Sequence, residues 1–200
     1  MKAPLIQIKN LHISVSTFLP EQLAASASFL EPGAVMPAAP ATPACGALTP
    51  PAIGEYWVGQ GGIYAGRREY PEGPCYVIFA ATDVGKHAYG ESGTSVGATS
   101  NIDGLENTAI LVNRDGSHPA ADAAYAYTCD GHQDFSLPSI GELNHAWLYI
   151  PESFAKEAYW SSSQRSANLA FTMLFADGLQ YYGVKGNELR VRPVRRLPIQ

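Results

Sequence analysis

The side chains best suited to bind a ligand lie in the segment 159–187. Aromatic rings stack on apolar faces of sugars, amides and cations hydrogen bond to hydroxyls, and the same mixture binds protein surfaces. Adjacent strand residues point to opposite faces, so at most one of Tyr181 and Tyr182 should be buried, whereas Trp160 is expected in the core. The candidate ligand-binding residues are Ser163, Gln164, Arg165, Asn168, Gln180, Tyr181, Tyr182, Lys185 and Asn187.

A serine nucleophile is not expected, although the run 161–163 consists of serines. The GxSxG elbow that exposes such a serine is absent from the sequence, and every histidine precedes this run. We expect the serines to turn the chain into the next strand and to hydrogen bond to the backbone. Glu142 and Glu157 have the chemistry of a glycosidase pair, but Glu142 stands at a helix-capping position. With no convergent set of titratable groups, we expect no enzyme activity and no catalytic residue.

Two further motifs have a structural interpretation. Asp130, His132 and Asp134 lie close together, but a third ligand at suitable spacing is missing, which favours a turn closed by Asp side chains. The glycine-rich run 59–66 is soon followed by Pro71, so it does not open the helix that a phosphate loop requires. The three cysteines form no CxxC or Cys/His cluster. We therefore predict no cofactor and no metal ligand.

The elements that must position the candidate residues are short, as expected from 19 Gly and 15 Pro. Ser139 and Glu142 have capping-box spacing and predict a helix that Pro151 ends. A second helix is predicted over 119–127, with Ser117 as its cap. Alternating apolar residues predict strands at 55–58, 76–81, 169–175, 179–184 and 189–194, and a buried run at 109–112.

Turn residues and composition complete the expected architecture. Asp177 and Gly178 predict a hairpin turn, and Gly186 with Asn187 predict a turn before the last strand. We therefore predict an α+β domain with a C-terminal antiparallel sheet over 51–200. Residues 1–18 alternate like a strand, residues 20–31 favour a short helix, and residues 32–53 are Pro-rich. Residues 1–50 are accordingly interpreted as an N-terminal arm and linker for docking or oligomerisation.

The composition argues against several kinds of partner. Charged residues make up 16% of the chain against a usual ~25%, and the net charge is −5, so a nucleic-acid partner is not expected. No apolar run approaches the ~18 residues of a membrane span, which argues against membrane insertion. The residues after Lys2 lack the apolar core of a signal peptide, so we expect synthesis in a reducing cytoplasm.

Five segments occur in an order that resembles a known family. They are GEYWVGQGGIYAG (54–66), DGHQDFSLPSIGELNHAW (130–147), YWSSSQRSANLAF (159–171), FADG (175–178) and KGNELRVRPVRR (185–196). Together they resemble the C-type-lectin-like domain family that includes the C-terminal domain of the Lcl collagen-like adhesin. That family is common in phage and prophage tail regions and on bacterial surfaces. The resemblance covers about residues 52–196.

The resemblance implies a C-type lectin fold, distantly related to the phage major tropism determinant and to formylglycine-generating enzymes. It places the ligand face on the C-terminal strands, which correspond here to residues 161–187. The core positions that it implies are Trp160, Phe175, Gly178, Val191 and Val194. The EPN, QPD and WND motifs of calcium-binding lectins are absent, and no cysteine follows Cys129. We therefore expect neither calcium-dependent sugar binding nor formylglycine chemistry.

Together these features predict a non-enzymatic binding module in a phage or prophage virion, at the tail tip or fibre. The expected partners are a host-surface glycan or protein, contacted through 161–187, and other virion subunits, contacted through residues 1–50. A homo-oligomer is expected, a trimer by analogy with tail fibres. The alternative is a structural virion subunit, in the baseplate or as a capsid decoration, that uses the fold only as a scaffold.

Overall fold

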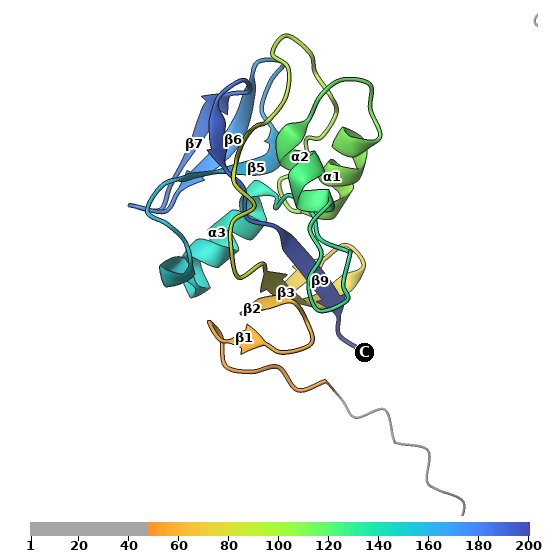
Figure 1. Cartoon of the computed structure of the whole chain (residues 1–200), viewed down its shortest axis with the longest axis vertical. Helices are drawn as coiled ribbons and strands as arrows, with labels where there is room; N and C mark the ends of the chain where they lie inside the picture. The colour runs from red at the N-terminus through yellow and green to blue at the C-terminus, as the bar shows by residue number, and fades with distance from the viewer. Residues whose placement is uncertain (1–47) are drawn as a thin grey trace, which may run out of the picture. The chain divides into compact units, whose positions relative to one another are not determined.

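The computed structural model describes residues 48–200, which form an α+β domain of short helices and mostly antiparallel strands (Figure 1). The structure expected for residues 1–47 lies outside the described residues. The strands are β1 (Tyr56–Trp57), β2 (Gly62–Tyr70), β3 (Gly73–Phe79), β4 (Lys86–Ala88), β5 (Ala158–Gln164), β6 (Leu169–Leu174), β7 (Leu179–Val184), β8 (Glu188–Arg190) and β9 (Val194–Pro198). The helices are α1 (Gly104–Val112), α2 (Pro119–Tyr125) and α3 (Ile140–Tyr149), with a 3₁₀ turn at Pro151–Ser153.

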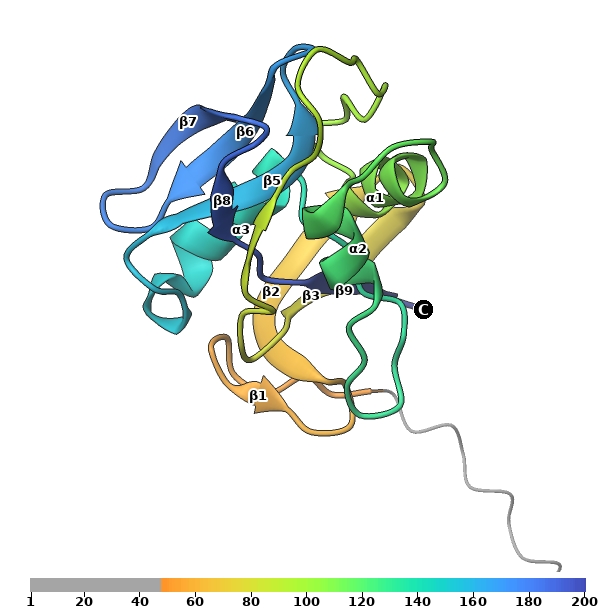
Figure 2. The ribbon, with the colours of Figure 1, turned by 45° about the horizontal axis from the view of Figure 1, so that its top comes forward.

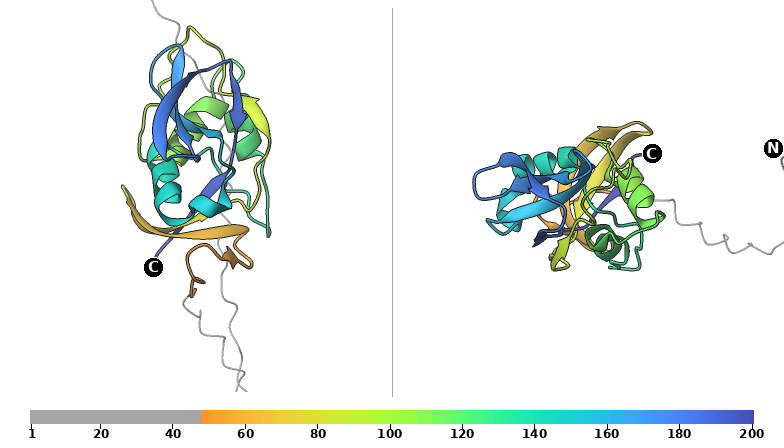
Figure 3. Two further views of the ribbon diagram at one scale, coloured as in Figure 1. Left: turned by 90° about the vertical axis from the view of Figure 1, so that its left-hand side faces the viewer. Right: turned by 90° about the horizontal axis from the view of Figure 1, so that it is seen from above.

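Within residues 48–200 the strands form two sheets. The first has the order β1-β2-β3-β9, and the second has the order β4-β8-β5-β6-β7. All pairs are antiparallel except β5 with β8. Figure 3 shows the hairpin of β6 and β7 at the end of the domain away from the C-terminus.

Strand β5 separates two parts of the core, because its adjacent aromatic residues point to opposite faces. Tyr159 packs with α3 and the first sheet, whereas Trp160 packs with residues of α1 and α2. Figure 2 shows β5 between α3 and the other two helices. Of the implied core positions, Trp160, Phe175, Val191 and Val194 are buried, while Gly178 lies in the hairpin turn.

The two helices predicted within the described residues are present, and the described domain has a further helix, α1, that the sequence analysis did not predict. Ser139 and Glu142 form the capping box of α3, and the helix ends before Pro151 as expected. Pro119 does begin α2, but the N-cap is His118 and not Ser117. The run expected at 109–112 is the end of α1, whose N-cap Asp103 accepts a hydrogen bond from the backbone N–H of Glu106.

Two predictions about the C-terminal strands were wrong. The serines 161–163 do not turn the chain: they lie inside β5, where a register shift accommodates them and their hydroxyls do bond to neighbours. The single strand expected at 189–194 is divided, since β8 belongs to the second sheet and β9 to the first. At the crossing, the Arg192 guanidinium bonds to Asp83 and to the carbonyls of Ala80 and Ser153, which holds the chain between the sheets.

Candidate binding surface

The candidate surface is built on the β6–β7 hairpin, whose turn has strict local requirements. The Asp177 carboxylate accepts a hydrogen bond from the backbone N–H of Leu179 at 3.0 Å. Gly178 has φ +77°, and a Cβ at this position would collide with the Trp147 ring of α3. Only glycine adopts this conformation beside the ring without strain, so the turn holds the hairpin against α3.

The most distinctive contact on the hairpin is a cation–π pair. The Arg165 guanidinium carbon lies 3.9 Å from the centroid of the Tyr182 ring. Arg165 belongs to the turn after β5, where its backbone N–H donates to Leu169 at 2.9 Å. Both side chains are exposed, Tyr182 to 55%. The stacked guanidinium keeps its N–H donors in one plane and is prepared to bind carboxylates, hydroxyls or carbonyls.

The face that carries this pair continues onto α3. The register places Tyr182 opposite Phe171 and Gln180 opposite Met173, so these side chains share one face. Asn144 of α3 donates to the Gln180 side-chain oxygen at 3.2 Å. Sequence reasoning did not identify Asn144 as a surface residue. The sequence places Asn144 beside the apolar face of a predicted helix. That position indicates a contact with the hairpin only when the packing of the hairpin against α3 is known.

The other predicted surface residues lie elsewhere on the hairpin. Tyr181 is 48% exposed, pairs with Thr172 and therefore points to the face opposite Tyr182. Asn168 and Asn187 are exposed in the turns that precede β6 and β8. Arg165, Gln180 and Tyr182 thus gather on one face, whereas the remaining three residues, Asn168, Tyr181 and Asn187, do not join that cluster.

Three of the predicted ligand-binding residues are buried, and their polar groups hydrogen bond to other groups of the domain. The Ser163 hydroxyl accepts from the N–H of Ile140 and donates to the Ser100 carbonyl. The Gln164 side-chain oxygen accepts from the Lys185 ammonium at 2.8 Å and from a backbone N–H of the loop 94–96. Burial and the nearby Arg114 charge lower the pKa of Lys185. These side chains position loops and the start of α3, so the prediction that Ser163, Gln164 and Lys185 contact a ligand at the surface is wrong.

The acidic and histidine cluster forms a turn, as predicted. The Asp130 carboxylate accepts from the Tyr56 hydroxyl at 3.0 Å and from the N–H groups of Gly59 and Gly61, and these bonds lower its pKa. Asp134 pairs with Arg195 at 2.8 Å. Within residues 48–200, no group of three or more His, Cys, Asp or Glu side chains has the arrangement of a metal site.

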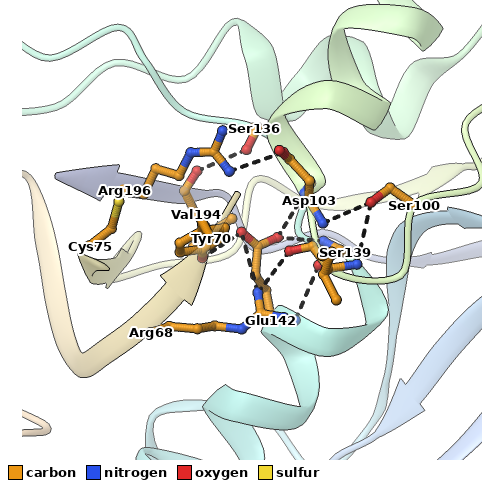
Figure 4. A network of polar contacts seen from close by, with 12 residues as sticks. Arg68, Tyr70, Cys75, Ser100, Asp103, Ser136, Ser139, Glu142, Val194 and Arg196 are labelled. Carbon is orange, nitrogen blue, oxygen red and sulfur yellow. Dashed lines mark hydrogen bonds and ion pairs between the residues drawn. The ribbon is translucent and has the colours of Figure 1, made fainter. Parts of the chain in front are cut away.

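Glu142 is not available as a surface carboxylate, because it is buried at the junction of three segments (Figure 4). One of its oxygens accepts from the N–H groups of Ser139 and Gly104, at 2.7 and 3.2 Å. The other accepts from the Tyr70 hydroxyl at 2.8 Å. Burial raises the pKa of Glu142, while these hydrogen bonds and the charge of Arg68 oppose the rise. The residue joins α1, α3 and β2.

A small pocket lies apart from the hairpin, beside the start of α2. Its lining includes Glu91, Asp115 and His118, and its volume is about 50 Å³. The buried Nδ1 atom of His118 has no hydrogen-bond partner. Ligand sites usually have volumes of ~300 Å³ or more, so this pocket has room for water molecules but not for a sugar or a peptide.

Comparison with known proteins adds no family assignment. No family model matches the chain, and no curated protein sequence matches it. Among the described residues, no helix has the length and apolar character needed to cross a membrane.

Proposed function

We propose that this chain is a non-enzymatic binding module that contacts a host-surface glycan or protein through the exposed face of its β6–β7 hairpin. The observation that carries the proposal is the exposed Arg165–Tyr182 stack with Gln180 beside it. A ring edge, a fixed guanidinium and an amide offer apolar and hydrogen-bonding contacts within one small area. This combination suits sugar hydroxyls and carboxylates as well as a protein loop.

We further propose that the domain has a C-type lectin-like fold and belongs to a phage or prophage virion, at the tail tip or fibre. The order of the five sequence segments supports this proposal, together with the α+β architecture and the C-terminal antiparallel strands. In the proposed virion, residues 1–50 dock to other subunits and the copies form a homo-oligomer, a trimer by analogy.

A structural virion subunit is the second candidate, and a specific observation favours it. Leu179, Tyr181 and Val184 of β7 are each about half exposed, which is unusual for large apolar side chains on a strand that serves only its own domain. In a baseplate or capsid these residues would pack against a neighbouring subunit.

The test is binding of the purified full chain to host cells and to a glycan array, with and without EDTA. Arg165→Ala and Tyr182→Ala should each weaken saturable binding by about tenfold or more, which corresponds to ~1.4 kcal/mol. The matched controls are Arg114→Ala and Tyr125→Ala, which remove an exposed arginine and a tyrosine of 56% exposure on other surfaces.

The variants separate the two candidates. Binding that survives both hairpin substitutions would contradict the proposed surface. A folded wild-type chain that binds no cell and no glycan, while a particle structure buries residues 161–187 between subunits, would establish the structural role. Insensitivity to EDTA is expected, since the calcium motifs of animal lectins are missing from the sequence.

A further inference from the structure

The outer edge of β7 differs from the other sheet edges of the described domain. In the first sheet, edge strand β1 has only two residues, and β9 carries Arg195, Arg196 and Pro198. In the second sheet, β4 has three residues and begins with a lysine. Short length, charge and proline are the usual means by which proteins prevent edge strands from pairing with other chains.

Strand β7 has none of these protections. Its six residues, LQYYGV, include no charged residue and no proline. The large side chains of Leu179, Tyr181, Tyr182 and Val184 are 48 to 55% exposed. Figures 1 and 2 show the strand at the outer side of its sheet, with β6 as its neighbour on the inner side. Its outer edge is therefore suited to pair with another strand.

The hydrogen-bond pattern defines which backbone groups face outward. The N–H of Phe175 donates to Glu157, so the odd-numbered residues of β6 direct their backbone groups toward β5. The N–H of Lys185 donates to Asn168, in agreement with this alternation. It follows that the odd-numbered residues of β7 bond to β6, whereas Gln180 and Tyr182 direct both their N–H and C=O groups away from the sheet. The Val184 N–H also points outward, but its C=O accepts from the Asn187 N–H at 2.9 Å in the turn after the strand.

We propose that β7 pairs with β7 of a second copy of this chain, antiparallel and around a two-fold axis at Tyr182. In this register Tyr182 faces Tyr182 of the second copy, and Gln180 faces its Val184. The Tyr182 backbone groups of the two copies then bond to each other, the Val184 N–H of each copy donates to the Gln180 carbonyl of the other, and the two sheets become one continuous sheet. A two-fold axis is the most common symmetry of homo-oligomers.

The side chains on the face of the sheet opposite Tyr182 favour this register. Tyr181 of one copy lies across from Gly183 of the other, in a pair without backbone hydrogen bonds, where side chains approach most closely. Gly183 has no side chain because a Cβ would lie 2.8 Å from the Trp160 ring. Because the Trp160 ring fills the space over Gly183, the Tyr181 ring of the second copy meets no side chain directly across from it and can lie along the strand. The register centred on Tyr181 would instead place Leu179 across from Gly183.

The pairing goes beyond the proposed ligand binding and does not depend on it. It brings the two Arg165–Tyr182 stacks to the same face of the joined sheet, which would allow one ligand to contact both copies. The two guanidinium groups repel each other there, and dissolved salt screens such exposed charges over about 8 Å at physiological ionic strength. Self-association through β7 should therefore strengthen as the salt concentration rises.

The first test is the mass of the full chain in solution, measured by analytical ultracentrifugation over a range of concentrations. Tyr181→Lys and Val184→Lys place charges on the edge and should weaken self-association at least tenfold. Leu148→Lys, at a 72% exposed position on α3, is the matched control and should leave it unchanged. A monomeric wild-type chain, or a mass in solution that is the same for the wild type and both folded edge variants, would overturn the proposal; an oligomer held by residues 1–50 alone gives this second result.

The second test measures disulfide cross-linking between copies and does not use the lysine variants. Residues directly opposite in such a pair have Cα atoms about 5.5 Å apart, within the range that a disulfide can bridge. Under mild oxidation Tyr182→Cys should form a covalent dimer rapidly, whereas Val58→Cys, 84% exposed on the β1 side, should behave like the wild-type chain with its three cysteines. Equal cross-linking of the two variants would contradict the proposed register even if the lysine variants fail to fold.

Discussion

At the residue scale, Glu142 shows how one buried side chain can join segments that are distant in the sequence. Its carboxylate accepts hydrogen bonds from the starts of α1 and α3 and from Tyr70 of β2 (Figure 4). Two helix N-termini direct N–H groups at the same oxygen, which is the arrangement that a carboxylate satisfies best. The capping box alone predicted only the contact with Ser139.

Glu142→Gln should destabilise the domain by about 2–4 kcal/mol. The amide replaces one acceptor oxygen by an NH₂ group, which leaves buried donors without a partner at a cost of ~1–3 kcal/mol each. The free energy of unfolding, measured by urea denaturation at neutral pH, checks this expectation. Glu152→Gln is the control, because the Glu152 side chain is 87% exposed and pairs only with Lys156 at a surface; its effect should stay within ~0.5 kcal/mol.

The residue scale also explains which parts of the binding surface were predictable. The exposure of Tyr181 and Tyr182 follows from the position of β7 at the edge of its sheet, with a neighbouring strand on one side only. The burial of Gln164 and Lys185 does not follow from residue type, since both are usually exposed. Their burial depends on the loop 94–96, whose backbone they hold, and this contact spans a separation in sequence that local patterns do not encode.

At the element scale, a group of ion pairs ties the loop before β4 to β5 and β8. The Glu157 carboxylate accepts from the Arg190 guanidinium at 2.6 Å and lies 2.6 Å from the Lys86 ammonium. These partners lower the pKa of Glu157 from 4.5 to about 2. Arg190 also bonds to Asp83, which in turn contacts Arg192 at the crossing between the sheets.

The lowered pKa of Glu157 predicts a pH dependence with a defined sign. A carboxyl group with a lower pKa in the folded state stabilises the fold above its unfolded pKa, and this stabilisation is lost as the group is protonated. The difference in unfolding free energy between wild type and Glu157→Gln should therefore be largest above pH 4.5 and vanish toward pH 2. Urea titrations at a series of pH values test this; a difference that grows on acidification would contradict it. Glu188→Gln, exposed on β8, is the control.

The N-cap of helix α1 should contribute to the stability of the domain. Asp103 accepts from the N–H of Glu106 at 2.9 Å and pairs with Arg196 of β9 at 3.1 Å. Asp103→Ala should cost ~1–2 kcal/mol of stability, because it removes both the cap and the ion pair. Asp103→Asn keeps a capping oxygen and removes only the charge, so it should retain most of that stability in thermal and urea denaturation. Equal losses in the two variants would assign the effect to the ion pair.

The elements that could be predicted are those with local signals. A capping box, a proline at a helix start and an Asp-Gly turn each act within a few residues, and α3, α2 and the hairpin follow from them. The helix α1 has the same kind of signal in Asp103 and Glu106, whereas the apolar run 109–112 marks only its last turn. The division of 189–194 between two sheets depends on tertiary contacts of Arg192 and could not be derived from that segment alone.

At the scale of the whole molecule, the described domain presents different surfaces at its two ends. The first described residues lie near β1, at the end opposite the β6–β7 hairpin (Figures 1 and 3). The proposed host contact therefore lies at the end of the described domain that is away from its first described residues. If the β7 edges also pair, two such domains would join at the end that carries the candidate surface.

Removal of residues 1–47 should separate the docking role proposed for these residues from the folding of the domain and from its pairing through β7. The buried clusters of the described domain are formed by residues between 57 and 194, so the shortened chain should unfold cooperatively at nearly the same temperature as the full chain. The proposed self-association through β7 should persist and remain sensitive to Val184→Lys, whereas incorporation into the proposed virion should be lost. Thermal denaturation, ultracentrifugation and recovery on purified particles measure the three properties. Normal incorporation of the shortened chain would refute the docking role of the arm, while loss of self-association on shortening would show that the arm, and not β7, holds the copies together.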